Sequence, residues 1–214
     1  MNNNTIVKDA VILCIITLIA GLCLGFVHEI TADPIAQAEA KAKQEAYQKV
    51  FPEASEFVKN DSESEAATNC TDTIASQGYD AVTIDEVLQA VDASGNVLGH
   101  VMSVTTSEGY GGNITISVGI KSDGTVIAME ILSISETAGL GANATKDEFK
   151  SQYANQNVDY YKLVKNGNQV NTEAAGGSTD APIDALSGAT ITSKAVTKAM
   201  NAANYFAKNI IKEG

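Results

Sequence analysis

Residues 184–193 place small side chains, hydroxyl groups and one carboxylate in front of an amphipathic helix-forming segment; they read Asp-Ala-Leu-Ser-Gly-Ala-Thr-Ile-Thr-Ser. The first N–H groups of a helix lack partners inside it, and the helix dipole is positive there, so this position would bind a phosphate group well. Small residues also let a ligand approach the backbone closely. The candidate residues are Ser187, Gly188, Ala189, Thr190 and Thr192. Helix physics alone leaves a second interpretation open, an ordinary loop in which a threonine or serine caps the helix.

Two further stretches are rich in glycine. Residues 136–141 read Glu-Thr-Ala-Gly-Leu-Gly, and residues 109–112 read Gly-Tyr-Gly-Gly. Together with the stretch Asp-x-x-Ser-Gly-Ala-Thr that ends at Thr190, they resemble, in the same order, segments of FMN-binding domains, including a Glu-Thr-Pro-Gly-Leu-Gly loop and the flavinylation motif. Ala138 stands where that family usually has proline, which loosens the turn. The resemblance covers roughly residues 82–211.

The resemblance implies a covalently bound flavin. In this family a dedicated transferase joins FMN through its phosphate to the hydroxyl of the motif's last threonine, which is Thr190 here. Gly188 and Ala189 would leave room for the phosphate. Ser187 and Thr192 would donate hydrogen bonds to phosphate or ribityl oxygens.

The loop 136–141 would wrap the flavin ring system. Thr137 and backbone groups, including that of Gly141, offer hydrogen bonds. Leu140 offers an apolar face to the ring, and a plain core role for it stays equally open. Glu136 either contacts ribityl hydroxyls or only fixes the loop.

Two residues outside these contacts have alternative roles. Tyr110 could stack on the ring, or it could be an ordinary tyrosine of an edge strand. Asp184 is expected to be recognised by the transferase or to order the turn. We expect no catalytic residue in this chain, because a flavin performs the electron chemistry while the protein sets its position, potential and exposure.

With its N-terminal apolar segment, the whole chain resembles the RnfG family, the G subunits of the Rnf ion-translocating ferredoxin:NAD oxidoreductase complexes. This resemblance implies an electron carrier that acts with the other membrane subunits of such a complex and obtains its FMN from a flavin transferase. NqrC, the C subunit of the sodium-pumping NADH:quinone reductases, is a related alternative. A membrane-anchored FMN-binding redox sensor and an anchored structural domain without flavin are alternatives of other classes.

The charge composition argues against nucleic-acid binding. The 214 residues have a formal net charge of −12, and all 14 basic residues are lysines. Nucleic-acid binding depends on neutralising phosphates, which an acidic chain does poorly. Without arginine there is also no guanidinium to bind a phosphate through two parallel hydrogen bonds, and a covalent phosphoester would make such a contact unnecessary.

Cysteines and histidines do not suggest a metal site, a disulfide framework or a catalytic triad. Cys14 and Cys23 are nine residues apart in the apolar segment, which places them on opposite sides of a helix, about 180° apart. Cys70 is alone in the rest of the chain, and His28 and His100 are the two histidines. We therefore expect no bound metal.

An uncharged segment, residues 10–27, is typical of a membrane-spanning helix. Its eighteen residues would extend about 27 Å, close to the thickness of the hydrocarbon layer. A cleaved signal peptide is the competing interpretation, but the apolar run is long for a signal peptide and no Ala-x-Ala-like site follows it directly. We expect an uncleaved single-pass anchor over residues 10–30 in the plasma (inner) membrane, with residues 1–9 in the cytoplasm and the remainder outside.

The expected domain organisation places a stalk helix and a polar excursion at residues 31–80 and an FMN-binding domain at residues 81–214. The stalk helix should begin at Thr31 or Asp33, with Pro34 in its first turn, and end at Val50. Residues 58–80 show no clear period and indicate a polar surface excursion.

Alternating patterns predict strands in the middle of the chain, and Asp-Gly and similar turn sequences join them into hairpins. The expected strands are 83–91, 96–105, 113–121, 125–133 and 160–165, with helices at 145–153 and 193–211 and a flexible approach to the threonine motif at 172–181. One face of strand 113–121 should be buried. This is an α+β pattern, an antiparallel hairpin sheet with helices packed on it, plus one N-terminal transmembrane helix.

Overall fold

The computed structural model describes residues 3–170 and 179–211. The chain divides into two compact units, Met1–Lys43 and Gln44–Gly214. Most of the segment 172–181, expected to be a flexible approach, lies outside the described residues, and its last two residues begin a strand. The α+β class predicted from the sequence is confirmed.

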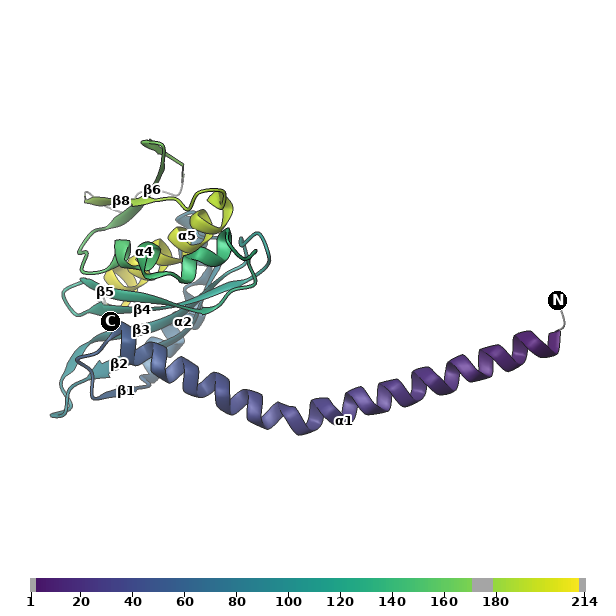
Figure 1. Ribbon diagram of the computed structural model, residues 1–214. Helices are drawn as coiled ribbons and strands as arrows, with labels where there is room; N and C mark the ends of the chain where they lie inside the picture. Colours follow the sequence, from purple (N-terminus) through teal and green to yellow (C-terminus); the bar gives the residue numbers. More distant parts are fainter. Residues whose placement is uncertain (1–2, 171–178, 212–214) are drawn as a thin grey trace. The chain divides into compact units, whose positions relative to one another are not determined.

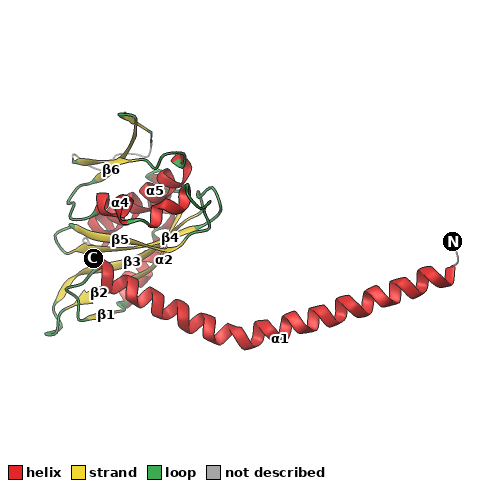
Figure 2. Cartoon of the chain, viewed as in Figure 1, coloured by secondary structure: helices red, strands yellow, loops and turns green. Residues whose placement is uncertain are grey.

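The first helix, α1 (Asn3–Val50), is continuous (Figure 2). The boundary expected at Thr31 or Asp33 is therefore wrong, and Pro34 lies inside the helix. The hydroxyl of Thr31 donates to the carbonyl of Val27 at 2.9 Å, within the helix, and does not cap a new one. Alanine, glutamine, lysine and glutamate, all strong helix formers, follow Pro34 and keep the helix intact across the missing N–H.

By length and composition, the part of α1 that begins at Val7 could cross a membrane. Its large apolar side chains are exposed; Leu13, Leu22 and Phe26 are 62%, 67% and 69% accessible. The hydroxyl of Thr17 donates to the carbonyl of Leu13 at 3.0 Å, so this polar group is satisfied inside the helix, as an apolar surrounding requires. These features fit the expected membrane association.

A five-stranded antiparallel meander forms the centre of the second unit (Figure 1). Its strands follow each other in chain order: β1 (Glu56–Val58), β2 (Val82–Val91), β3 (Val97–Thr106), β4 (Ile114–Lys121) and β5 (Val126–Ser133). The predicted hairpins β2–β3 and β4–β5 are confirmed. Gly124 turns the second with φ +88°, and the Asp123 carboxylate accepts the Thr125 N–H at 2.8 Å.

Both faces of β4 are buried, although the sequence pattern predicted one. Ile116 and Val118 lie in the larger core, together with residues of helix α5 (Thr190–Phe206). On the opposite face, a Cβ on Gly119 would lie 2.2 Å from the carbonyl oxygen of Val50, so the chain leaving α1 covers this side. A glycine at this position permits that close approach.

Helix α5 lies between the meander and a smaller sheet (Figure 1), contacting β3 and β4 on one side and β6 (Tyr160–Lys165) on the other. It continues as a turn of π-helix, Ala207–Ile211. Its apolar side chains Val196, Ala199 and Phe206 are buried. Polar residues of α5 are buried too. The Asn201 side chain accepts the Tyr161 N–H at 2.7 Å and donates to the Tyr161 carbonyl at 3.0 Å.

The smaller sheet has the order β7 (Asn168–Gln169), β6, β8 (Asp180–Asp184), and its β6–β8 pair is parallel. The sequence predicted β6 but neither β8 nor the parallel pair. Because parallel neighbours end at the same edge of a sheet, the segments that follow β6 and β8 emerge side by side.

The region expected to be a polar excursion is largely helical. It contains α2 (Asp61–Asn69) and α3 (Thr71–Ser76), and the Asn60 side chain caps α2 by accepting from the N–H groups of Ser62 and Glu63. Four of its apolar residues, Ala67, Cys70, Ile74 and Tyr79, are buried in the larger core. Short η1 (Gly141–Thr145), α4 (Asp147–Lys150) and η2 (Ser151–Tyr153) follow β5, where a helix over 145–153 was expected.

Candidate functional site

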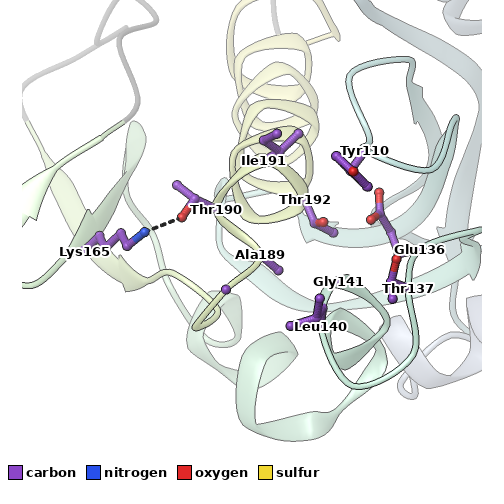
Figure 3. A pocket seen from close by; sticks show the side chains of 11 residues that line it. Tyr110, Glu136, Thr137, Leu140, Gly141, Lys165, Ala189, Thr190, Ile191 and Thr192 are labelled. Atoms are coloured by element: carbon purple, nitrogen blue, oxygen red, sulfur yellow. Dashed lines mark hydrogen bonds between the residues drawn. The ribbon is translucent and has the colours of Figure 1, made fainter.

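A cleft of about 510 Å³ opens at the N-terminal end of α5 (Figure 3). Four segments form it: the loop before β4, the loop after β5, the end of β6 and the start of α5. The lining residues are Tyr110, Glu136, Thr137, Leu140, Gly141, Lys165, Gly188, Ala189, Thr190, Ile191 and Thr192. All the residues that the sequence suggested for a flavin site are therefore here, with the exception of Ser187.

The helix begins earlier than expected. Thr190 is the first residue of α5, and Ala189 in front of it provides no side-chain cap. Ser193, which was expected near the helix start, instead accepts the Leu186 N–H at 2.9 Å and donates to the carbonyl of Ala189 at 2.9 Å. The alternative of an ordinary threonine or serine cap is thus wrong, and the first-turn N–H groups remain for a ligand.

The turn before α5 depends on a glycine. Gly188 has φ +76°, a left-handed conformation, and a Cβ at this position would lie 3.0 Å from Leu140. Ser187 is exposed and does not line the cleft. Asp184 is also exposed. The Gln152 side chain accepts the Asp184 N–H at 2.7 Å and donates to the Asp184 carbonyl at 3.4 Å. Neither of these side chains is therefore part of the cleft.

The loop 136–141 is fixed by its own residues. The Thr137 carbonyl accepts the N–H groups of Leu140 and Ala142 at 3.1 and 3.2 Å, which closes the turn that lacks the family's proline. The Glu136 carboxylate accepts the Gly111 N–H at 3.1 Å. Glu136 therefore fixes the loop, one of its two expected roles.

Gly141 marks the tightest point of the cleft. A Cβ there would lie 2.5 Å both from Glu136 Oε2 and from Thr192 Oγ1. The carboxylate and the hydroxyl therefore lie side by side against this glycine. Thr192 is almost completely buried, at 1% exposure, whereas Thr190, which also lines the cleft, is half-buried.

Three exposed apolar side chains border the cleft: Tyr110, Leu140 and Ile191, at 73%, 44% and 52% exposure. Two further large apolar side chains, Val58 and Val97, are exposed among the described residues after Lys43. The core role considered for Leu140 is wrong. Tyr110 lies in the loop between β3 and β4 and is not an edge-strand residue. A concentration of exposed apolar surface at one cleft is typical of a ligand site.

Lys165 and Ile191 line the cleft without having been predicted. The Lys165 ammonium donates to the Thr190 hydroxyl at 2.8 Å (Figure 3). The parallel pair brings them together, because the Ala185 N–H bonds to the Val164 carbonyl at 2.8 Å, which places the ends of β6 and β8 next to each other. For Ile191 the sequence did contain a signal, because it is an apolar residue next to Thr190 in the first turn of α5.

An ion-pair network links helix α5 to the loop that contains Tyr110. The buried ammonium of Lys198 lies 2.7 Å from Glu108 and 3.0 Å from Asp80. Burial lowers the pKa of Lys198, but its hydrogen bonds to Glu108 and Asp80 outweigh burial, so the pKa is raised. The hydrogen bond from Lys198 in turn lowers the pKa of Asp80. Thus α5 anchors the loop that carries Tyr110.

The cleft fits an FMN group. The uncapped helix start and Lys165 suit a phosphate, and the exposed apolar side chains suit the faces of an aromatic ring system. Within residues 3–170 and 179–211, no three His, Cys, Asp or Glu side chains are placed to hold a metal ion.

Comparison with known proteins agrees with this fit. A model of the FMN-binding domain matches residues 109–204, and a model of the RnfG N-terminal region matches residues 1–50. The G subunit of an ion-translocating oxidoreductase complex from Methanosarcina acetivorans is 31% identical over 203 residues, 94% of each chain. The G subunit of a proton-translocating ferredoxin:NAD(+) oxidoreductase complex from Clostridium ljungdahlii is 32% identical over 92% of this chain and 88% of its own.

A crystal structure of the C subunit of the Na(+)-translocating NADH-quinone reductase from Parabacteroides distasonis matches with a TM-score of 0.45 and 25% identity, over 58% of this chain and 62% of that chain. The matched family model shows an FMN-binding domain over residues 109–204, and all residues that line the cleft lie within this range. The chain as a whole belongs to the RnfG family, the G subunits of ion-translocating oxidoreductase complexes.

Proposed function

We propose that this chain is the electron-carrier subunit of a membrane-bound ferredoxin:NAD oxidoreductase complex that translocates ions, and that its FMN is joined to Thr190 through a phosphoester. The Clostridium ljungdahlii relative bears that complex in its name. The observation that carries the attachment is the position of Thr190, which lines the cleft and is the first residue of an uncapped helix.

Thr190 is a better attachment point than Thr192. A hydroxyl that reacts with a large flavin donor in the active site of a transferase has to be reachable. Thr192 is 1% exposed and lies against Gly141 and the Glu136 carboxylate, whereas Thr190 is half-buried and its hydroxyl contacts the exposed Lys165 side chain. Modification at Thr192 would require the packing around Gly141 to open.

Each group around the cleft has a defined task in this proposal. FMN, when bound, accepts and donates electrons. The first-turn N–H groups of α5 stabilise the negative charge of the phosphate. Leu140, Ile191 and Tyr110 exclude water from the apolar ring, and Glu136 holds the two loops at fixed spacing. Electron transfer needs no acid, base or nucleophile from the protein.

The same proposal includes the topology and the partners. Residues 10–30 cross the plasma (inner) membrane once, residues 1–9 are cytoplasmic, residues 31–80 form a stalk region, and the FMN-binding domain at 81–214 faces the outside. Other membrane subunits of the complex deliver and remove electrons, and a flavin transferase attaches the FMN. The match of residues 1–50 to the RnfG N-terminal region favours an RnfG role over an NqrC role and over a redox sensor.

The test is expression of the full chain in cells that contain the transferase, followed by a denaturing gel under ultraviolet light and peptide mapping by mass. We expect a fluorescent band and an FMN mass increment on the peptide with Thr190, both lost in Thr190→Ala and kept in Thr192→Ala. A wild-type band without fluorescence would overturn the covalent flavin. Fluorescence retained in Thr190→Ala would overturn the attachment point.

A further inference from the structure

Lys165 is the single cation among the described residues that line the cleft, and Glu136 is the single carboxylate. The two charges lie beside different threonines. The Lys165 ammonium donates to Thr190 Oγ1 at 2.8 Å. Glu136 Oε2 instead shares the space in front of Gly141 with Thr192 Oγ1, each 2.5 Å from the position of a Cβ there.

We propose that Lys165 is a positioning residue that binds the phosphoryl group of the flavin at Thr190 and makes the cleft selective for a phosphorylated flavin. This role rests on the function proposed above. It concerns a contact that involves no bond making or breaking by the lysine.

The existing hydrogen bond explains why the lysine can serve a free and a modified threonine. An ammonium carries three donors that rotate about one bond, so it can bond the hydroxyl oxygen of the free threonine and, after modification, a non-bridging oxygen of the phosphate esterified to that hydroxyl. A hydrogen bond between two charged groups is roughly twice as strong as a neutral one. The positive end of α5 adds to the attraction, because Thr190 is its first residue.

The arrangement of charges also favours Thr190 over Thr192. A phosphate at Thr192 would lie next to the Glu136 carboxylate, since both Thr192 Oγ1 and Glu136 Oε2 lie in front of Gly141, and two neighbouring negative charges repel. A phosphate at Thr190 would face the Lys165 ammonium. In a chain with a net charge of −12 and no arginine, one lysine placed at this threonine is a specific feature of the cleft.

A purely structural role for Lys165 makes a different prediction. The side chain is exposed, and hydrogen bonds and ion pairs at exposed positions contribute little to stability. If the lysine only covered Thr190, its removal would change binding of every flavin equally or not at all. A comparison of two ligands that differ by the phosphate alone therefore separates the two roles.

The experiment uses the full chain in detergent, produced in cells without the transferase, and titrates it with FMN and with riboflavin while flavin fluorescence is recorded. We expect the wild-type chain to prefer FMN, and Lys165→Met to weaken FMN binding about tenfold, equivalent to about 1.4 kcal/mol, without changing riboflavin binding. Lys165→Arg should restore most of the preference. Lys162→Met is the matched control, because Lys162 is on the same strand, pairs with Asp180 at 2.8 Å and does not line the cleft.

Two outcomes would overturn the role of Lys165. One is a preference for FMN that survives in Lys165→Met, and the other is a wild-type chain without any preference for FMN, including one that binds neither flavin. Both outcomes leave the covalent attachment to be judged separately, by fluorescence of the wild-type band after expression with the transferase. Loss of that band would overturn the proposed function itself.

Discussion

The Glu136 carboxylate accepts a hydrogen bond of 3.1 Å from the backbone N–H of Gly111, although 25 positions separate the two residues. Gly111 also packs so closely that a Cβ there would lie 2.2 Å from the carbonyl oxygen of Ser135. The loop before β4 and the loop after β5 therefore form one wall of the cleft, held together by a single carboxylate.

Replacement of Glu136 should separate these loops. In Glu136→Ala, we expect faster hydrogen exchange in residues 109–112 and 136–141, and less flavin bound per chain, with a loss of about 1–2 kcal/mol in stability, because a hydrogen bond to a charged group is lost. Glu136→Gln keeps an acceptor oxygen and should exchange nearly as slowly as wild type. Equal exchange in all three proteins would contradict this role.

Gly141→Ala should damage the cleft more than its size suggests. The added methyl would meet Glu136 Oε2 and Thr192 Oγ1 at 2.5 Å, and the buried threonine has little room to move. Overpacking of this kind should reduce stability by about 1–3 kcal/mol and lower flavin loading. The control is Gly25→Ala in α1, where nothing lies within 4 Å; it should leave both the domain's thermal midpoint and its loading unchanged.

Ile191→Ser should weaken flavin binding without destabilising the protein. Ile191 is already 52% exposed, so its replacement removes little core packing, but a ring bound in the cleft would lose an apolar contact of about 1 kcal/mol. We expect riboflavin affinity of the unmodified chain to fall about fivefold, measured by fluorescence titration. Val97→Ser, at an exposed strand position outside the cleft, is the control, and the same loss in that variant would contradict the assignment.

Lys198→Met should alter the acid dependence of stability. The pKa of Asp80 is lowered in the folded state by Lys198, so this interaction stabilises the protein above the unfolded carboxyl pKa of about 4 and is lost as pH falls through the lower folded value. At the alkaline end, the raised pKa of Lys198 means that its contribution is complete below its unfolded pKa, about 10.4, and is lost as pH rises through the folded value.

Denaturant titrations between pH 7 and pH 2 would measure this dependence. We expect the wild-type chain to lose more unfolding free energy below pH 4 than Lys198→Met, which is already less stable at pH 7 by about 1 kcal/mol. Parallel curves for the two proteins would show that Asp80 gains nothing from Lys198.

The parts of the fold that depend on neighbouring residues were predictable. The hairpins follow from alternating strands and short turns, and the four strands of these hairpins, β2 to β5, begin and end within one residue of the predicted bounds. The helices α2 and α3 were missed because they are short and mostly polar. Four side chains of this region are buried, and they are buried because of contacts with distant parts of the core. Local composition does not contain that information.

The candidate site was likewise predictable only where its residues are close together in the sequence. The motif and the loop residues from Tyr110 to Thr192 were identified from sequence, because they occur as contiguous stretches. Lys165 was missed because its position beside Thr190 results from the parallel pairing of β6 and β8, which no local sequence pattern predicts. Ser187 belongs to the motif but is exposed and does not line the cleft, because membership of a motif does not determine where a side chain lies.

Burial of α5 between two sheets also limits how electrons can be exchanged. Thr190 is the first residue of this packed helix, so a flavin attached there as proposed would keep its position within the domain, unlike a prosthetic group on a long flexible arm. Donor and acceptor would then both have to approach the open side of the same cleft.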